Sequence, residues 1–194
     1  LKVFCQLGFI LIYLQRYFSL PAKAHILSLF LFPVSTNYVM KMINCFIPFL
    51  SLPQARQTVR ALGLCDRIKN IYLLATEKIP DEVEGCEMLM IDSPASTATF
   101  RTIALHADTA YTLLYTKYTA FEPGQFAFER LLAIAGDTNA GMLYADRYLL
   151  KNGNSQQAPV IDYQKGSLRD DFDFGSLLFF RSSVLKQAVR AMEC

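Results

Sequence analysis

The densest group of residues that could do chemistry is the run from Arg169 to Gly175, which carries Asp170, Asp171 and Asp173. Carboxylates in a loop can bind a divalent cation, or they can accept hydrogen bonds from the hydroxyl groups of a sugar. We select Asp171 and Asp173 as candidate catalytic residues on the acceptor side of a site. A solvated, turn-forming loop is an equally good interpretation, because aspartate is common in turns.

A further carboxylate, Asp146, follows an apolar segment in the run Tyr144-Ala145-Asp146-Arg147. It is a candidate ligand for a divalent cation, and the alternative is an ordinary pattern of surface charges on a strand. The five cysteines are scattered, without the close pairs of a metal site, which favours reduced thiols. The sequence motifs of serine hydrolases, zinc proteases and P-loop proteins are missing from the sequence.

Composition indicates one folded domain with a sizeable core, because 53% of the 194 residues are hydrophobic and 19% are charged. Residues 1–39 hold Lys2, Arg16 and Lys23 but no acid. The rest of the chain is therefore close to neutral, since the whole has 19 basic and 17 acidic residues. A nearly neutral body lacks the basic surface that nucleic acid binding requires, so we expect no nucleic acid partner.

The first 39 residues differ from the rest. Their two apolar runs, Val3–Leu14 and Ile26–Val34, are shorter than the roughly 18–20 residues that span a membrane. We interpret residues 1–39 as an upstream extension outside the working protein; the rival interpretation is a membrane anchor. We expect a cytoplasmic protein, located at the inner face of the membrane if residues 1–39 anchor it. The domain proper is 40–194, and it looks incomplete because its last helix reaches Cys194 without a stop signal.

The elements that must position these residues alternate between strands and helices. A buried strand over Ile43–Leu50, closed by Pro48, precedes a helix that Ser51 caps and Gly63 ends. The next predicted elements are strands over 68–75 and 87–91, a helix over 97–107 and a strand over 110–115.

The second half of the chain has a less regular pattern. The run Glu122-Pro123-Gly124 predicts the start of a helix that ends near Gly136. The segment 141–150 reads as one strand, with a turn at Asn152-Gly153 and a returning strand over 159–163. A strand over 175–180 and a helix capped by Ser182 or Ser183 complete the pattern.

This order predicts an α/β fold: a Rossmann-like, mostly parallel sheet flanked by helices, with an antiparallel hairpin added. In open sheets of this kind, ligands bind beyond the carboxyl ends of the strands. We therefore expect Pro48, Phe49 and Leu50 to mark the start of a binding crevice.

Several stretches of the body resemble the family-two inverting glycosyltransferases of the GT-A fold. The matching stretches are Cys45-Phe46-Ile47-Pro48-Phe49-Leu50, Ala75-Thr76-Glu77, the helix from Thr97 with Arg101 leading to the strand Tyr111–Tyr115, and the run from Gly175 through Phe179-Phe180-Arg181 to Leu185. The resemblance implies transfer of a sugar from a nucleotide-sugar donor to a hydroxyl of a glycan or lipid-linked acceptor, as in bacterial polysaccharide assembly. It also implies that Pro48–Leu50 and Glu77 hold the nucleoside.

The sequence departs from the family where the family carries Asp-x-Asp to hold a divalent cation. The corresponding run here is Thr116-Lys117-Tyr118, so Mg²⁺ or Mn²⁺ lacks its usual oxygen ligands. One hypothesis is that Lys117, with Thr116 and Arg101, faces the donor diphosphate as a point charge. The alternative is that Lys117 is a solvated lysine at a strand end.

The resemblance places the family's catalytic base beyond the last element of this chain. A second reading of the same residues is therefore a non-catalytic module that binds a nucleotide or sugar. A nucleotidyltransferase is a third reading, but it needs a glycine-rich loop where this chain has Ser51-Leu52-Pro53-Gln54.

Overall fold

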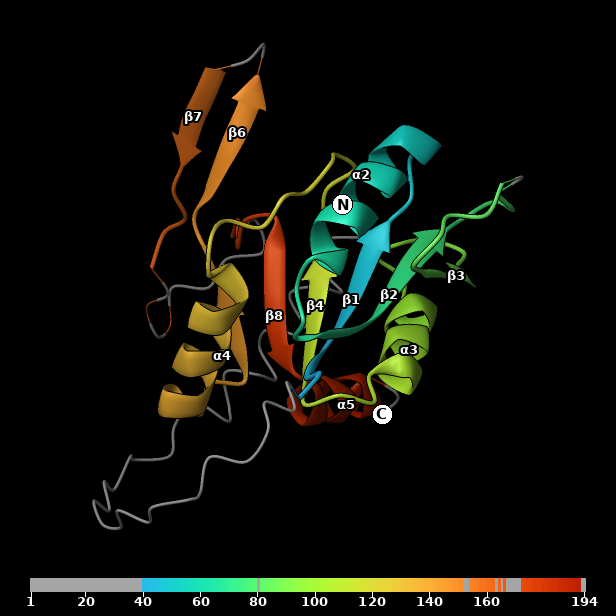
Figure 1. Ribbon diagram of the computed structural model, residues 1–194. Helices are drawn as coiled ribbons and strands as arrows, with labels where there is room; N and C mark the ends of the chain where they lie inside the picture. The colour runs from blue at the N-terminus through green and yellow to red at the C-terminus, as the bar shows by residue number, and fades with distance from the viewer. Residues whose placement is uncertain are drawn as a thin grey trace, which may run out of the picture.

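The computed structural model describes residues 40–79, 81–151, 154–162, 164, 166 and 172–192. The chain forms a six-stranded sheet in the order β3-β2-β1-β4-β8-β5 and a separate two-stranded sheet, β6-β7 (Figure 1). The predicted α/β fold with a mostly parallel sheet, flanking helices and an antiparallel hairpin is therefore confirmed. Residues 1–39 lie outside the described residues, so the interpretations of that segment stay predictions.

The parallel half of the sheet is built around β1 (Ile43–Pro48), which pairs with β2 (Ile68–Ala75) on one side and β4 (Tyr111–Tyr115) on the other. The short strand β3 (Glu87–Met90) extends it beyond β2. All residues of β1 are buried, as expected for a central strand covered on both faces.

Helices close both faces of the sheet. α2 (Leu52–Gly63) and α4 (Ala127–Thr138) pack on the face that contains Ile43, Cys45 and Ile47. α3 (Thr97–His106) and α5 (Ser182–Ala191) pack on the opposite face, around Phe46. The alternating residues of β1 thus serve two separate cores, one on each face.

The antiparallel half consists of β8 (Leu177–Arg181), which pairs with β4 and with β5 (Met142–Tyr144). The prediction of one strand over 141–150 is wrong, because the segment divides between two sheets. β8 begins at Leu177, after Gly175 at a φ of +84°, so β5 has no partner strand beyond Tyr144. The chain then continues as β6 (Arg147–Lys151).

β6 pairs with β7 (Asn154–Ala158), with Lys151 opposite Asn154. The returning strand was predicted over 159–163 and lies earlier, because it pairs directly across the two-residue connection. The predicted turn residues Asn152 and Gly153 lie outside the described residues. Figure 1 shows this hairpin projecting from the body on the side where the arrows of β1 and β4 end.

Two helix starts differ from the prediction. Glu122–Gly124 has no regular structure, and α4 begins at Ala127 after Phe126, which is left-handed with a φ of +55°. α4 also continues past Gly136 and ends before Asn139, another left-handed residue.

The N-cap of α5 is Arg181 rather than Ser182 or Ser183. Ser182 is buried as the first residue of the helix, with its hydroxyl 2.8 Å from the Thr112 hydroxyl on β4. By contrast, Ser51 caps α2 as predicted, since its hydroxyl accepts a hydrogen bond from the Gln54 N–H.

Among the described residues, no helix has both the length and the apolar character needed to cross a membrane.

Candidate functional site

The best candidate site lies at the carboxyl ends of β1 and β4, where the strand order of the sheet reverses. From β1 the chain passes through α2 to β2, and it later returns through α3 to β4 on the other side of β1. The crossover through α2 and the crossover through α3 lie on opposite faces of the sheet, and the strand order reverses between β1 and β4. A reversal of this kind leaves a crevice in open α/β sheets, and ligands bind there.

The side chain of Gln54 joins the segments that follow β1 and β4. Gln54, in the first turn of α2, accepts a hydrogen bond from the Leu50 N–H at 3.3 Å. Its amide nitrogen donates to the Thr119 carbonyl in the segment after β4 at 3.2 Å. The positions of the segments after β1 and β4 are therefore coupled through Gln54.

The predicted nucleoside residues lie at this edge. Pro48 is the buried last residue of β1, and Phe49 is half-buried with its N–H donating to the Leu74 carbonyl. Leu50 is 60% exposed and offers an apolar surface to a ligand. Their location agrees with the prediction, while their role in binding stays a prediction.

Glu77 and Arg101 follow β2 and β3, the strands on the other side of β1 from β4. Glu77 follows β2 and is exposed. Arg101 lies in the N-terminal half of α3, which follows β3, and is exposed as well. These two residues are thus separated from the group described next, which gathers at the end of β4 and the start of β8.

The segment that replaces Asp-x-Asp begins with a threonine that is already engaged. The Thr116 N–H donates to the Ser176 carbonyl at 2.9 Å, and its hydroxyl lies 3.3 and 3.4 Å from the Ser176 and Gly175 carbonyls. Lys117 and Tyr118 follow and are exposed. Thr116 therefore joins β4 to the start of β8, and Lys117 is the first residue free to face a ligand.

Asp173 lies beside this junction, on the segment that leads into β8. One carboxylate oxygen accepts from the Gly175 N–H at 2.9 Å, and the other lies 3.1 Å from Nη2 of Arg147. Burial raises the pKa of Asp173, but the Gly175 N–H and the charges of Arg147 and Lys117 outweigh it, so the pKa lies below its usual value. Asp173 is therefore an ionised carboxylate in contact with Arg147, and the charge of Lys117 also acts on it.

Arg147 is the residue that sequence reasoning missed, since it looked like part of a surface charge pattern. Its side chain is only 20% exposed, while that of Asp173 is 60% exposed. A Cβ at Gly175 would lie 3.2 Å from Nη1 of Arg147, so the missing side chain leaves room for the guanidinium. The signal in the sequence was the Asp173-Phe174-Gly175 run, whose tight turn brings a carboxylate to a buried cation.

The remaining acidic candidates do not join this group in the described structure. Asp146 is exposed, and one of its oxygens accepts from the Val160 N–H at 2.8 Å. Asp171 lies outside the described residues. No set of three or more His, Cys, Asp or Glu side chains is grouped to hold a metal ion in the described part of the chain.

Thiol chemistry is not supported at the described cysteines. Cys45, Cys65 and Cys86 are free thiols. Burial raises the pKa of all three, that of Cys86 to about 11, so the thiolate nucleophile is scarce at neutral pH.

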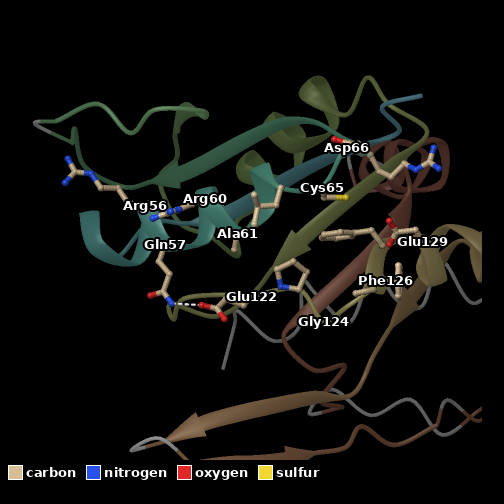
Figure 2. A pocket seen from close by; sticks show the side chains of 15 residues that line it. Arg56, Gln57, Arg60, Ala61, Cys65, Asp66, Glu122, Gly124, Phe126 and Glu129 are labelled. Atoms are coloured by element: carbon tan, nitrogen blue, oxygen red, sulfur yellow. Dashed lines mark hydrogen bonds between the residues drawn. The ribbon is translucent and has the colours of Figure 1, made fainter. Parts of the chain in front are cut away.

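The structure shows a hollow in a different place from the predicted site residues. It is a groove of about 830 Å³ between α2 and the start of α4, and none of the predicted site residues lines it. Figure 2 shows Gln57 and Glu122 pointing towards each other at one side of it, joined at 2.8 Å. Charged residues of both signs line the groove, namely Arg56, Arg60, Arg67, Asp66, Glu122 and Glu129. This mixture gives the groove no net preference for an anion.

A comparison with models of known protein families found no match to this chain, and a comparison with curated proteins found none either.

Proposed function

We propose that this domain binds a nucleotide sugar above the carboxyl ends of β1 and β4 and transfers the sugar to an acceptor hydroxyl. The observation that carries the proposal is the reversal of strand order between β1 and β4. Leu50 after β1 and Lys117 after β4 are both exposed at this point. An apolar surface for a base and a cation for phosphates thus flank the same point.

The roles follow from the chemistry of each side chain. Phe49 and Leu50 would contact the nucleoside, and Glu77 would accept hydrogen bonds from its polar groups. Lys117 would face the diphosphate, with Arg101 as a second cation from the other side of β1. Asp173 would accept hydrogen bonds from hydroxyl groups of the bound sugars.

In the reaction, the acceptor oxygen forms a bond to the anomeric carbon of the donor sugar. The bond from that carbon to the diphosphate oxygen breaks, and the nucleoside diphosphate leaves with the electron pair. The hydroxyl proton passes to a carboxylate base. The cationic side chains near the diphosphate would stabilise the charge that develops on the leaving group.

A non-catalytic nucleotide or sugar binding module is the second candidate, and Asp173 favours it. Both of its oxygens already have partners, and its lowered pKa makes it a weak base. An assay that detects release of the nucleoside diphosphate from a nucleotide sugar separates the two candidates, because only a transferase hydrolyses or transfers the sugar. Tight binding without any turnover would favour the module.

The proposal is tested by thermal unfolding of the 194-residue chain with nucleoside diphosphates and nucleotide sugars. A ligand at ~100 times its dissociation constant should stabilise the protein by about 2.7 kcal/mol, which is a readable shift. Absence of a shift with every nucleotide would contradict the transferase and a nucleotide-binding module alike.

The acceptor that we propose is a glycan or a lipid-linked molecule in the cytoplasm. A lipid-linked acceptor would bring the domain to the inner face of the membrane. Separation of cells into membrane and soluble fractions tests this location, and a protein found only in the soluble fraction would contradict a membrane-bound acceptor.

A further inference from the structure

Arg147 is a cation whose hydrogen bonding is incomplete. Nη2 has Asp173 as its partner at 3.1 Å, whereas Nη1 is buried without a hydrogen-bond partner among the described residues. A buried donor without a partner costs about 1–3 kcal/mol, and more for a charged group. The protein therefore holds an incompletely bonded guanidinium beside the start of β8, which calls for an explanation.

The carboxylate that does contact Arg147 is a weak partner. Asp173 reaches the guanidinium through one oxygen only, because its other oxygen accepts from the Gly175 N–H. A two-point contact between arginine and a carboxylate is stronger than this single one. The carboxylate is also 60% exposed, and exposed ion pairs contribute little to stability. An incoming anion can therefore replace Asp173 at small cost.

A second cation begins close to the same carboxylate, because Lys117 follows Thr116, whose hydroxyl lies 3.4 Å from the Gly175 carbonyl. The charge of Lys117 contributes to lowering the pKa of Asp173, after the Gly175 N–H and Arg147. Asp146 precedes Arg147 directly and brings a negative charge, but one of its oxygens accepts from the Val160 N–H. The charges of Lys117 and Arg147 therefore both act on Asp173, the one carboxylate with a described contact to Arg147.

We propose that Arg147 and Lys117 form a binding site for a diphosphate, and that Asp173 occupies this site when no ligand is bound. The diphosphate displaces the Asp173 carboxylate from Nη2 of Arg147, and it takes up the two positive charges that the carboxylate shares. This inference rests on the proposed function, because it assigns residues to the diphosphate of the donor. It adds Arg147 to the site and gives Asp173 the role of an internal competitor.

The two possible roles of Asp173, competitor of the ligand or support of the fold, predict opposite effects of its removal on diphosphate affinity. If Asp173 competes with the ligand, Asp173→Asn removes a negative charge from the site and tightens diphosphate binding, by about threefold to tenfold. Arg147→Met and Lys117→Met remove cations and weaken it, the former by about tenfold or more. If the Arg147–Asp173 pair only supports the fold, removing either partner acts in the same direction or leaves binding unchanged.

The test is isothermal titration calorimetry of the 194-residue chain with pyrophosphate and with UDP and GDP. The buffer contains EDTA, so that metal-mediated binding does not contribute. Matched controls come from the ion pair at the other edge of the sheet, where Lys69 contacts Asp108. Lys69→Met and Asp108→Asn should leave diphosphate affinity unchanged, and thermal unfolding checks that each variant is folded.

Tighter binding by Asp173→Asn together with weaker binding by Lys117→Met supports the inference, even if Arg147→Met fails to fold. Unchanged or weaker binding by Asp173→Asn overturns it, and so does absence of pyrophosphate binding by the unmodified chain. Failure of the proposed function looks different: the chain would bind pyrophosphate with the expected variant pattern but would not prefer any nucleotide.

Discussion

The amino ends of the parallel strands form one edge of the sheet, the amino edge, and their carboxyl ends form the carboxyl edge. Each edge holds a contact between a cation and an aspartate, and the two contacts differ in which group is buried. At the amino edge, Lys69 and Asp108 are both partly exposed, with 42% and 52% of their side chains accessible. The group inside is the neutral amide of Asn44, which is fully buried and donates to both Asp108 and the His106 carbonyl at 2.7 Å.

At the carboxyl edge the charged group itself is inside. Arg147 is largely buried, while its carboxylate partner Asp173 is exposed. Nη1 of Arg147 and Oδ1 of Asn44 both lack a partner among the described residues, so the two edges differ in the charge of the buried group. A buried neutral amide ties β1 to the end of α3 and fixes the fold. A buried, incompletely bonded cation is suited to meet an anion that arrives from outside. The difference suggests that the amino edge serves stability and the carboxyl edge serves binding.

The largest effect is expected from Asn44→Ala at the amino edge. The change leaves the Asp108 carboxylate and the His106 carbonyl without the buried amide, and it opens a cavity in β1. We expect a loss of about 2–4 kcal/mol in the free energy of unfolding. Urea unfolding measures it, and Asn70→Ala on β2, whose side chain contacts only the Tyr72 hydroxyl at 3.1 Å, is the control. Nucleotide affinity should not change, and a selective loss of affinity would reverse the roles of the two edges.

Gly175→Ala should be the most damaging glycine substitution at the carboxyl edge. It places a Cβ 3.1 Å from Val160 and 3.2 Å from Arg147, at a φ of +84°. We expect a loss of about 1–3 kcal/mol in unfolding free energy, together with weaker diphosphate binding because Arg147 is displaced.

Gly85→Ala is the matched control for this change. Gly85 has a φ of +85°, but its nearest neighbour for a new Cβ is Val59 at an ordinary 3.5 Å. The control should therefore show the cost of the backbone conformation alone. Equal losses in the two variants would contradict a crowded Arg147.

A smaller effect on stability is expected from Gln54→Leu, which removes the link between the segments after β1 and β4. We expect a loss of about 1 kcal/mol in unfolding free energy. We also expect a clear loss of nucleotide affinity, because the segments after β1 and β4 become less fixed. Gln57 lies one helical turn after Gln54, and Gln57→Leu serves as the control because it removes only an exposed hydrogen bond to Glu122. Equal affinity in the two variants would count against a site above β1 and β4.

The smallest effect should appear in acid. The Lys69 ammonium and the Asn44 amide hold the pKa of Asp108 below its ordinary value of 3.8. At Asp173, burial raises the pKa, but the Gly175 N–H and Arg147 outweigh it and the pKa is also lowered. Each carboxylate therefore stabilises the fold fully above pH 3.8, and this stabilisation is lost as the pH falls through the lowered pKa.

Urea unfolding at a series of pH values below 5 or so would measure this loss. Asp108→Asn and Asp173→Asn should each make the acid side of the profile flatter. With a diphosphate bound, the contribution of Asp173 should shrink because Arg147 has a new partner, whereas that of Asp108 should stay the same. A ligand that alters both contributions equally would contradict a site at one edge.

The parallel half of the fold was predictable from the sequence because its signals are local. The apolar run of β1, the cap at Ser51 and the periodicity of α2 agree with one another, and the structure confirms all three. The antiparallel half depends on partners far apart in the chain. The segment 141–150 had the apolar pattern of one strand, but the extent of β8 decides where β5 ends.

The candidate site shows the same division. Pro48, Leu50 and Lys117 could be placed at the carboxyl edge because each follows a predicted strand. Arg147 could not, since its burial comes from a contact with Asp173, which lies 26 positions away, and from the room left by Gly175. Sequence patterns report which residues end a strand, but they do not report which side chain from another sheet packs beside it.

Hydrogen–deuterium exchange of the 194-residue chain, with and without saturating UDP or GDP, tests most directly whether a nucleotide binds above β1 and β4. We predict slower exchange at the amides of 49–51 and 116–121 when the nucleotide is present. Exchange should stay unchanged at 106–111, on the amino edge, and at 126–129, along the groove beside α4. Protection confined to the groove or to the amino edge, or unchanged exchange throughout with a nucleotide that binds, would contradict this account.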